Sequence, residues 1–265
     1  MKNSINTVIL MCFFTSMLFA QVKNLAFKTC QLKNQKVKDA YDTKWNMLKA
    51  EMKGSKINAD EFDIYIRALK ADKVVEVWMR NKSEVKYHLF KTYAICSNGL
   101  ESNNSDVENQ MPEGFYQIEL FNPKSNYYLS MQINYPNNSD IMLNKKDNAY
   151  DEIMLNGDCA TINGLSMTND AIKELYVLCL EVRNRNKPIY IDIYPTKLSD
   201  ENFKMLEANH SKSQLSFWKT LKPMYDYFEE NKLLPGISLD KKGHYVLSDD
   251  DDASDSKRLS ASANH

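Results

Sequence analysis

The stretch from Ile153 to Thr168 brings together groups that could act on an acyl carbon. It contains Asp158, Cys159 and Thr161 within four consecutive positions. A thiol attacks a carbonyl as the thiolate, so it needs a neighbouring base, most often a histidine. The histidines are His88, His210, His244 and His265. None is close to this stretch in sequence, so any base for Cys159 must come from elsewhere in the fold.

The same stretch resembles the signature of the L,D-transpeptidase catalytic-domain (YkuD-like) family, bacterial enzymes that cut and rejoin peptidoglycan stem peptides. That signature reads His-Gly, three residues, Ser or Thr, one apolar residue, then Gly-Cys. The Cys is the nucleophile and the His belongs to its activating apparatus. Gly157, Thr161 and Ile162 match the signature, whereas Asn156 stands at the His position and Asn163-Gly164 at the Gly-Cys position.

Three further stretches, in the expected order, resemble the murein peptide amidase and transpeptidase branch of this family. They are Phe62–Cys96, Pro112–Pro136 and Phe217–Phe228. The family's upstream Gly-Asp pair is replaced by Val107-Glu108. The resemblance implies an α+β fold: a β-rich sandwich with the signature loop at its mouth, flanking helices, and helical extensions at both ends.

The substitutions at the signature imply that no catalytic residue is intact. Gly164 has no thiol, and Asn156 cannot accept a proton near pH 7. Removing both members of such a unit leaves at most residual catalysis. The expected ligands of the remaining groove are peptidoglycan stem peptides or a cell-wall enzyme. The predicted groove residues are Asn156, Gly157, Asp158, Thr161, Asn163 and Gly164.

Two alternatives stay open. The chain could be an active transpeptidase or amidase with Cys159 as a relocated nucleophile. It could also be a purely structural or interaction protein, with the 213–231 helix and Trp218 as its partner surface. The first requires activity that stops on Cys159→Ala, and the second requires binding that fails on Trp218→Ala.

The periodicity of apolar residues predicts the elements that position this loop. Spacings of three and four predict helices at 31–53 and 169–185, the second capped by Thr168. Further helices are predicted after Ser199 and around 215–228, where Pro223 should kink or divide the element. Alternation predicts strands within 62–79, 87–93, 115–120, 127–133, 189–193 and 244–247.

The ends of the chain predict an exported, periplasmic protein. Lys2 and the apolar run Val8–Phe19 resemble a signal peptide over 1–20, too short to span a bilayer. We expect a helical segment at 21–60, the family-like domain at 61–198, a helical extension at 199–248 and a disordered acidic tail at 249–265. No later stretch is long enough for a membrane span. The net charge of −1 argues against nucleic acid as a binding partner.

Four cysteines remain after the predicted leader: Cys30, Cys96, Cys159 and Cys179. Export permits disulfides, but four cysteines allow three pairings and the sequence does not choose among them. Cys96 with Cys159 is the bridge we favour if one exists, and Cys179, on an apolar helix face, should be buried and reduced. The sequence shows neither a glycine-rich phosphate loop nor a metal-spaced cluster, so no cofactor or metal is expected.

Overall fold

The computed structural model describes residues 27–96, 111–143, 152–159 and 164–248 of the 265-residue chain. The helices are α2 (Gln35–Gly54), α3 (Asn138–Met142), α4 (Asn169–Asn184), α5 (Asp200–Asn209) and α6 (Lys212–Asn231). The strands are β1 (Phe62–Leu69), β2 (Val74–Asn81), β3 (His88–Ala94), β4 (Gly114–Asn122), β5 (Ser130–Ile133), β6 (Met154–Asn156), β7 (Gly164–Ser166), β8 (Tyr190–Tyr194), β9 (Ile237–Leu239) and β10 (Tyr245–Leu247). The predicted leader, the acidic tail, Val107-Glu108, Thr161 and Asn163 lie outside the described residues.

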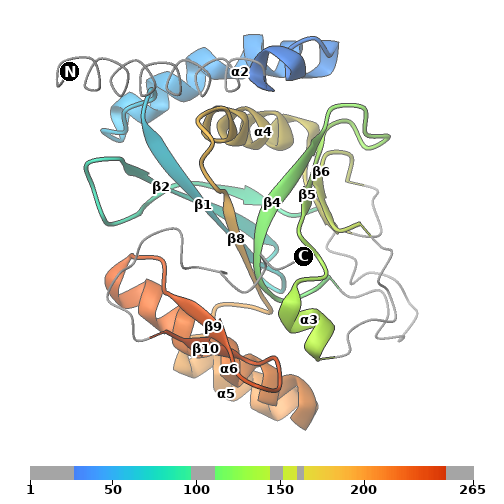
Figure 1. Cartoon of the computed structure of the whole chain (residues 1–265), viewed down its shortest axis with the longest axis vertical. Helices are drawn as coiled ribbons and strands as arrows, with labels where there is room; N and C mark the ends of the chain where they lie inside the picture. The colour runs from blue at the N-terminus through green and yellow to red at the C-terminus, as the bar shows by residue number, and fades with distance from the viewer. Residues whose placement is uncertain (1–26, 97–110, 144–151, 160–163, 249–265) are drawn as a thin grey trace, which may run out of the picture.

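Eight strands form one mixed sheet in the order β3-β2-β1-β8-β4-β5-β6-β7. The β1–β8 and β6–β7 pairs are parallel, and the other neighbours are antiparallel. β4 joins the two halves, because Gly114–Gln117 pairs with β8 and Ile118–Asn122 pairs with β5. The predicted α+β class is confirmed, with the β-rich layer built as a single sheet between two groups of helices (Figure 1).

The two outermost strands of this sheet meet. Cys96, just after β3, donates its backbone N–H to the carbonyl oxygen of Ser166 in β7 at 2.8 Å. β3 and β7 are the first and last strands in the sheet order, so the sheet must curl to bring them together. Open sheet edges expose unpaired backbone groups, and this contact satisfies part of both edges. The seam runs beside the signature loop, which leads directly into β7.

Helices α4 and α2 cover one side of the sheet, with α2 outermost (Figure 1). The apolar stripe of α4 is fully buried in the main core, and Thr168 caps the helix as predicted. Lys44 on α2 forms ion pairs with Asp170 at 2.6 Å and Glu174 at 3.2 Å on α4. The helices predicted at 31–53 and 169–185 are confirmed, within a few residues at each end.

Helices α5 and α6 and the β9–β10 hairpin cover the other side (Figure 1). An ion-pair network around the buried Arg67 fixes α6 to the sheet: Arg67 on β1 pairs with Glu76 at 2.7 Å and with the half-exposed Glu229 of α6 at 2.5 Å. The guanidinium lies over the rings of Tyr225 and Phe228. Because β1, β2 and α6 each contribute a residue to this network, α6 is joined directly to the sheet.

Two expectations for α6 need correction. The helix is not divided at Pro223 but runs continuously from Lys212 to Asn231, because Leu221 and Met224 on either side are buried in the core. Trp218 is only 4% exposed, and its indole N–H donates to Glu113. This side chain is therefore part of the packing rather than an anchor for a partner. The domain boundaries stay a prediction.

Candidate functional site

Strands β6 and β7 frame the signature loop. The chain leaves β6 at Asn156 and returns at Gly164, with β6 paired to β5 on one side and to β7 on the other. The register places Ser130, Asn156 and Ser166 opposite one another on three neighbouring strands. Side chains in register lie on the same face of a sheet, so these three form a short polar row beneath the loop.

Asn156, at the His position of the signature, is fully buried. Its side-chain oxygen accepts a hydrogen bond from the Ser166 hydroxyl at 3.1 Å. The hydroxyl of Ser130, on the other side, is buried with no hydrogen-bond partner in the described part of the chain. A neutral amide held in this row orients its neighbours but takes up no proton near pH 7. Asn156 therefore supplies no base at this position.

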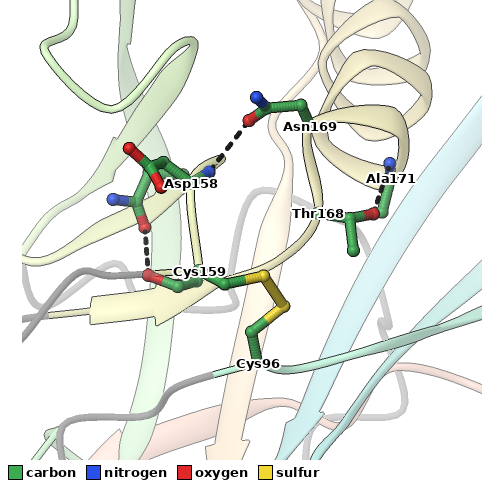
Figure 2. Close-up of a disulfide and its surroundings, with 8 residues drawn as sticks. Cys96, Asp158, Cys159, Thr168, Asn169 and Ala171 are labelled. Carbon is green, nitrogen blue, oxygen red and sulfur yellow. Dashed lines mark hydrogen bonds between the residues drawn. A yellow bond between two sulfur atoms is a disulfide. The ribbon is translucent and has the colours of Figure 1, made fainter.

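Gly157 and Asp158 shape the start of the loop. A Cβ at Gly157 would lie 2.4 Å from the side-chain oxygen of Asn169, so only glycine allows this approach. That same oxygen accepts the backbone N–H of Asp158 at 2.9 Å (Figure 2). The backbone of Asp158 is left-handed, with φ of 57°, and so is that of the neighbouring Tyr128, with φ of 69°. Lys56, Lys73, Asn186 and Lys232 are left-handed too, so this conformation does not by itself single out the loop.

Gly164, which the resemblance places at the nucleophile position, has a strained backbone and close neighbours. Its φ is +135°, a conformation that residues with a Cβ rarely adopt. A Cβ built there would lie 2.3 Å from the carbonyl oxygen of Met154, its partner on β6. Position 164 therefore carries no thiol, and its backbone conformation leaves no room for a cysteine side chain.

Cys159 is joined to Cys96 by a disulfide, which confirms the favoured pairing (Figure 2). In this state Cys159 has no thiol to serve as a nucleophile, which counts against its role as a relocated catalytic residue. Cys179 is free and buried as predicted, and burial raises the pKa of its thiol. Cys30 is free and exposed.

The described histidines make their contacts elsewhere. His210 lies against the Trp218 ring, and His244 is 3.1 Å from the Asp240 carboxylate. His88 lies on β3, in register with Met79 of β2. Groups of three or more potential metal ligands are also lacking among the described residues, and no helix in that part of the chain is long and apolar enough to cross a bilayer.

Two lysines beside the loop were missed by the sequence analysis. The ammonium groups of Lys36 on α2 and Lys173 on α4 lie 5.8 and 5.5 Å from the centre of the Tyr128 ring. Lys36 donates to the carbonyl oxygens of Ser125 and Tyr128. No carboxylate of a described residue lies within ion-pair distance of either lysine. The two residues come from helices far apart in sequence, so no local pattern could have joined them.

Among the predicted groove residues, the structure brings Asn156, Gly157, Asp158 and Gly164 to one end of the sheet, next to Tyr128 and Asn169. Thr161 and Asn163 lie outside the described residues. The backbone N–H groups of Gly157 and Asp158 already donate within the fold, to Leu129 and Asn169. The charged groups at the loop are the two lysines and the Asp158 carboxylate.

Comparison with known proteins identifies relatives that match most of the chain. No protein-family model matches the chain. "Putative L,D-transpeptidase YafK" of Escherichia coli K12 is 31% identical over 192 residues, covering 70% of this chain and 74% of the relative, and the Escherichia coli O157:H7 protein of the same name gives the same values.

Similarity to solved structures is weaker. The helical cell shape determining protein Pgp2 from Campylobacter jejuni aligns with a TM-score of 0.39 and 15% identity, covering 68% of this chain and 74% of that one. Bd1075 from Bdellovibrio bacteriovorus aligns with a TM-score of 0.36 and 17% identity, covering 61% and 71%. These scores are too low to support an inference. The sequence identity to YafK over most of both chains is sufficient, and the chain belongs to the L,D-transpeptidase family.

Proposed function

We propose that this chain is an exported, periplasmic member of the family that binds peptidoglycan stem peptides without cutting or rejoining them. The observation that carries the proposal is the state of Gly164, which lacks a nucleophile and whose backbone leaves no room for a Cβ. Asn156 supports it, since a buried amide replaces the activating imidazole. The nature of the ligand rests on family membership.

Of the predicted groove residues that the structure describes, Asp158 is exposed and would contact the peptide, while the buried Asn156, Gly157 and Gly164 would support the backbone of the loop. Stem peptides carry carboxylates, and Lys36 and Lys173 supply positive charge beside the loop. Hydrogen bonds between a charged donor and a carboxylate are the stronger kind, and complementary charge favours the encounter. Lys36 also supports the loop from Ser125 to Tyr128, which leaves Lys173 as the cleaner residue for a binding test.

Export is part of the proposal. Its support is the charged Lys2 followed by the apolar run Val8–Phe19 at the start of the chain. A disulfide between Cys96 and Cys159 is consistent with an oxidising compartment, because such bonds seldom persist in the cytosol.

The test combines binding and chemistry on one sample. The chain from residue 21 onward is incubated with purified sacculi, which are then pelleted and digested for muropeptide mass spectrometry. We expect the protein in the pellet and an unchanged muropeptide profile, with an active L,D-transpeptidase as the positive control for product formation. New cross-links or released peptides would contradict the catalytic part, and protein that stays in the supernatant would contradict the binding part.

A pair of charge-removing variants locates the contact. Lys173→Gln should weaken pelleting, since it removes a cation beside the loop. Lys241→Gln removes an exposed lysine between β9 and β10 and should leave pelleting unchanged. Equal pelleting of both variants would place the binding surface away from the signature loop.

A further inference from the structure

A pocket of about 430 Å³ lies where four elements meet, away from residues 156–159. Its polar lining comprises Gln117 and Glu119 from β4, Asn134 after β5, Asn138 from α3 and Arg183 from α4. It opens beyond the Ile133 end of β5, whereas Asn156 pairs with Ser130 at the other end of that strand. Pockets of a few hundred Å³ with convergent polar groups are typical ligand sites.

Arg183 is the unusual member of this lining. It is half-buried and donates hydrogen bonds to the carbonyl oxygens of Ile118 and Glu119. Among the described residues, no carboxylate lies within ion-pair distance of its guanidinium. Burial lowers the pKa of Arg183. Charges withdrawn from water are normally paired, because desolvation without a counter-ion is costly.

Arg185, two residues further along, shows the usual arrangement. It also donates to a backbone carbonyl, that of Phe62, at 2.8 Å, and lies over the Phe62 ring. Four carboxylates act on its charge, those of Glu181, Asp63, Glu61 and Asp60. Among the described carboxylates, only that of Glu119 acts on Arg183, and Glu119 is itself an exposed residue of the pocket lining. The pocket therefore presents one cation and one anion side by side.

This pair defines a ligand. A guanidinium binds a carboxylate through two parallel hydrogen bonds, and an exposed carboxylate accepts hydrogen bonds from an ammonium group. The amides of Gln117, Asn134 and Asn138 line the same pocket and can form hydrogen bonds with the carboxylate oxygens and the ammonium hydrogens.

We propose that this pocket binds a free amino acid in its zwitterionic form, with the carboxylate on Arg183 and the ammonium group on Glu119. A ligand with both charges on one carbon balances both walls at once. A ligand with only a negative charge would be repelled by the carboxylate of Glu119. The site goes beyond the proposed function, because it uses none of the loop residues.

The test uses NMR titration of the ¹⁵N-labelled chain with D-alanine as the probe. The reporters are the side-chain amide signals of Gln117, Asn134 and Asn138. D-alanine amide lacks the carboxylate and N-acetyl-D-alanine lacks the ammonium group, so each should bind about tenfold more weakly or not at all. Equal shifts with all three probes, or none with D-alanine, would overturn the proposal.

Matched variants assign the two charges. Arg183→Gln should weaken D-alanine binding about tenfold, while Arg185→Gln, at the same helix end, should leave it within about twofold. Glu119→Gln, at an exposed position, should weaken D-alanine but not N-acetyl-D-alanine, and it stays informative if Arg183→Gln fails to fold. Unchanged binding in Glu119→Gln would overturn the role of the anion. Lys173→Gln should not affect this titration, which separates the pocket from binding at the signature loop.

Discussion

The backbone of Gly164 lies so close to Met154 that a Cβ on Gly164 would be 2.3 Å from the Met154 carbonyl oxygen. The two residues are in register on the parallel strands β7 and β6. The contact therefore belongs to the sheet itself and not to a loop that could move aside. The backbone therefore leaves no room for a side chain at the position that the resemblance assigns to the nucleophile.

Any Cβ at Gly164 should accordingly destabilise the fold. We expect Gly164→Ala to lower the free energy of unfolding by about 1–3 kcal/mol, from the strained φ alone, with the contact to Met154 adding to this. Urea denaturation measures the loss. Gly54→Ala is the control, since a Cβ there meets nothing within 4 Å, and its effect should stay within about 1 kcal/mol.

The same geometry predicts that restoring the motif does not restore the reaction. The triple variant Asn156→His, Asn163→Gly, Gly164→Cys should leave the muropeptide profile of sacculi unchanged. The present conformation of β7 has no room for the Cβ of a cysteine at position 164. A thiol-dependent product in this variant, abolished by alkylation, would show that the strand adapts and that only side chains were lost.

The Cys96–Cys159 bridge should contribute strongly to stability. It spans 63 positions of the sequence, and loop-closure entropy for that length amounts to about 4 kcal/mol. We expect the double variant Cys96→Ser, Cys159→Ser to unfold at markedly lower urea concentration and to become insensitive to dithiothreitol. Cys30→Ser, which replaces an exposed free thiol, should match the parent chain. A double variant as stable as the parent would mean that the seam holds without the bridge.

The elements with their own one-sided apolar pattern were predictable from sequence. Helix α4 shows this clearly: its stripe and its Thr168 cap are both local signals, and both are confirmed. Strands β6 and β7 span three residues each, too few for alternation to be visible. The curl of the sheet could not be predicted from the sequence either, because it depends on a contact between Cys96 and Ser166 that no local pattern encodes.

The candidate site divides in the same way. The signature positions Asn156 and Gly164 were predicted because a linear motif carries them. The φ of Gly164 and the placement of Lys36 beside Tyr128 depend on how β6, β7 and α2 meet in space. The pairing of Arg67 with Glu229 joins residues 162 positions apart, and sequence spacing holds no record of such a partner.

Ser130 and Ser139 offer a direct comparison of two buried hydroxyls. Ser139 donates to the carbonyl oxygen of Gly243 at 2.7 Å, whereas Ser130 has no partner among the described residues. Removing a satisfied hydroxyl costs about 1 kcal/mol, while removing an unsatisfied one is neutral or stabilising. We expect Ser139→Ala to lower the unfolding free energy and Ser130→Ala not to. A loss in Ser130→Ala would reveal a hydrogen bond from outside the described residues.

The last prediction concerns the pH dependence of the α6 attachment. Burial acts to raise the pKa of Glu229, but its bonds to Lys232 and Arg67 outweigh burial and hold that pKa below the ordinary 4.5. A carboxyl whose pKa is lowered by folding stabilises the folded state above its unfolded-state pKa. That contribution is lost as the pH falls through the folded-state pKa. The stability difference between the parent chain and Glu229→Gln should therefore be largest above about pH 5 and shrink below about pH 4. Urea denaturation at several pH values measures it.

Glu230→Gln, at the exposed neighbouring position, should change stability by less than about 0.5 kcal/mol throughout. A difference for Glu229→Gln that does not vary with pH would mean that the carboxylate charge does not hold α6 to β1.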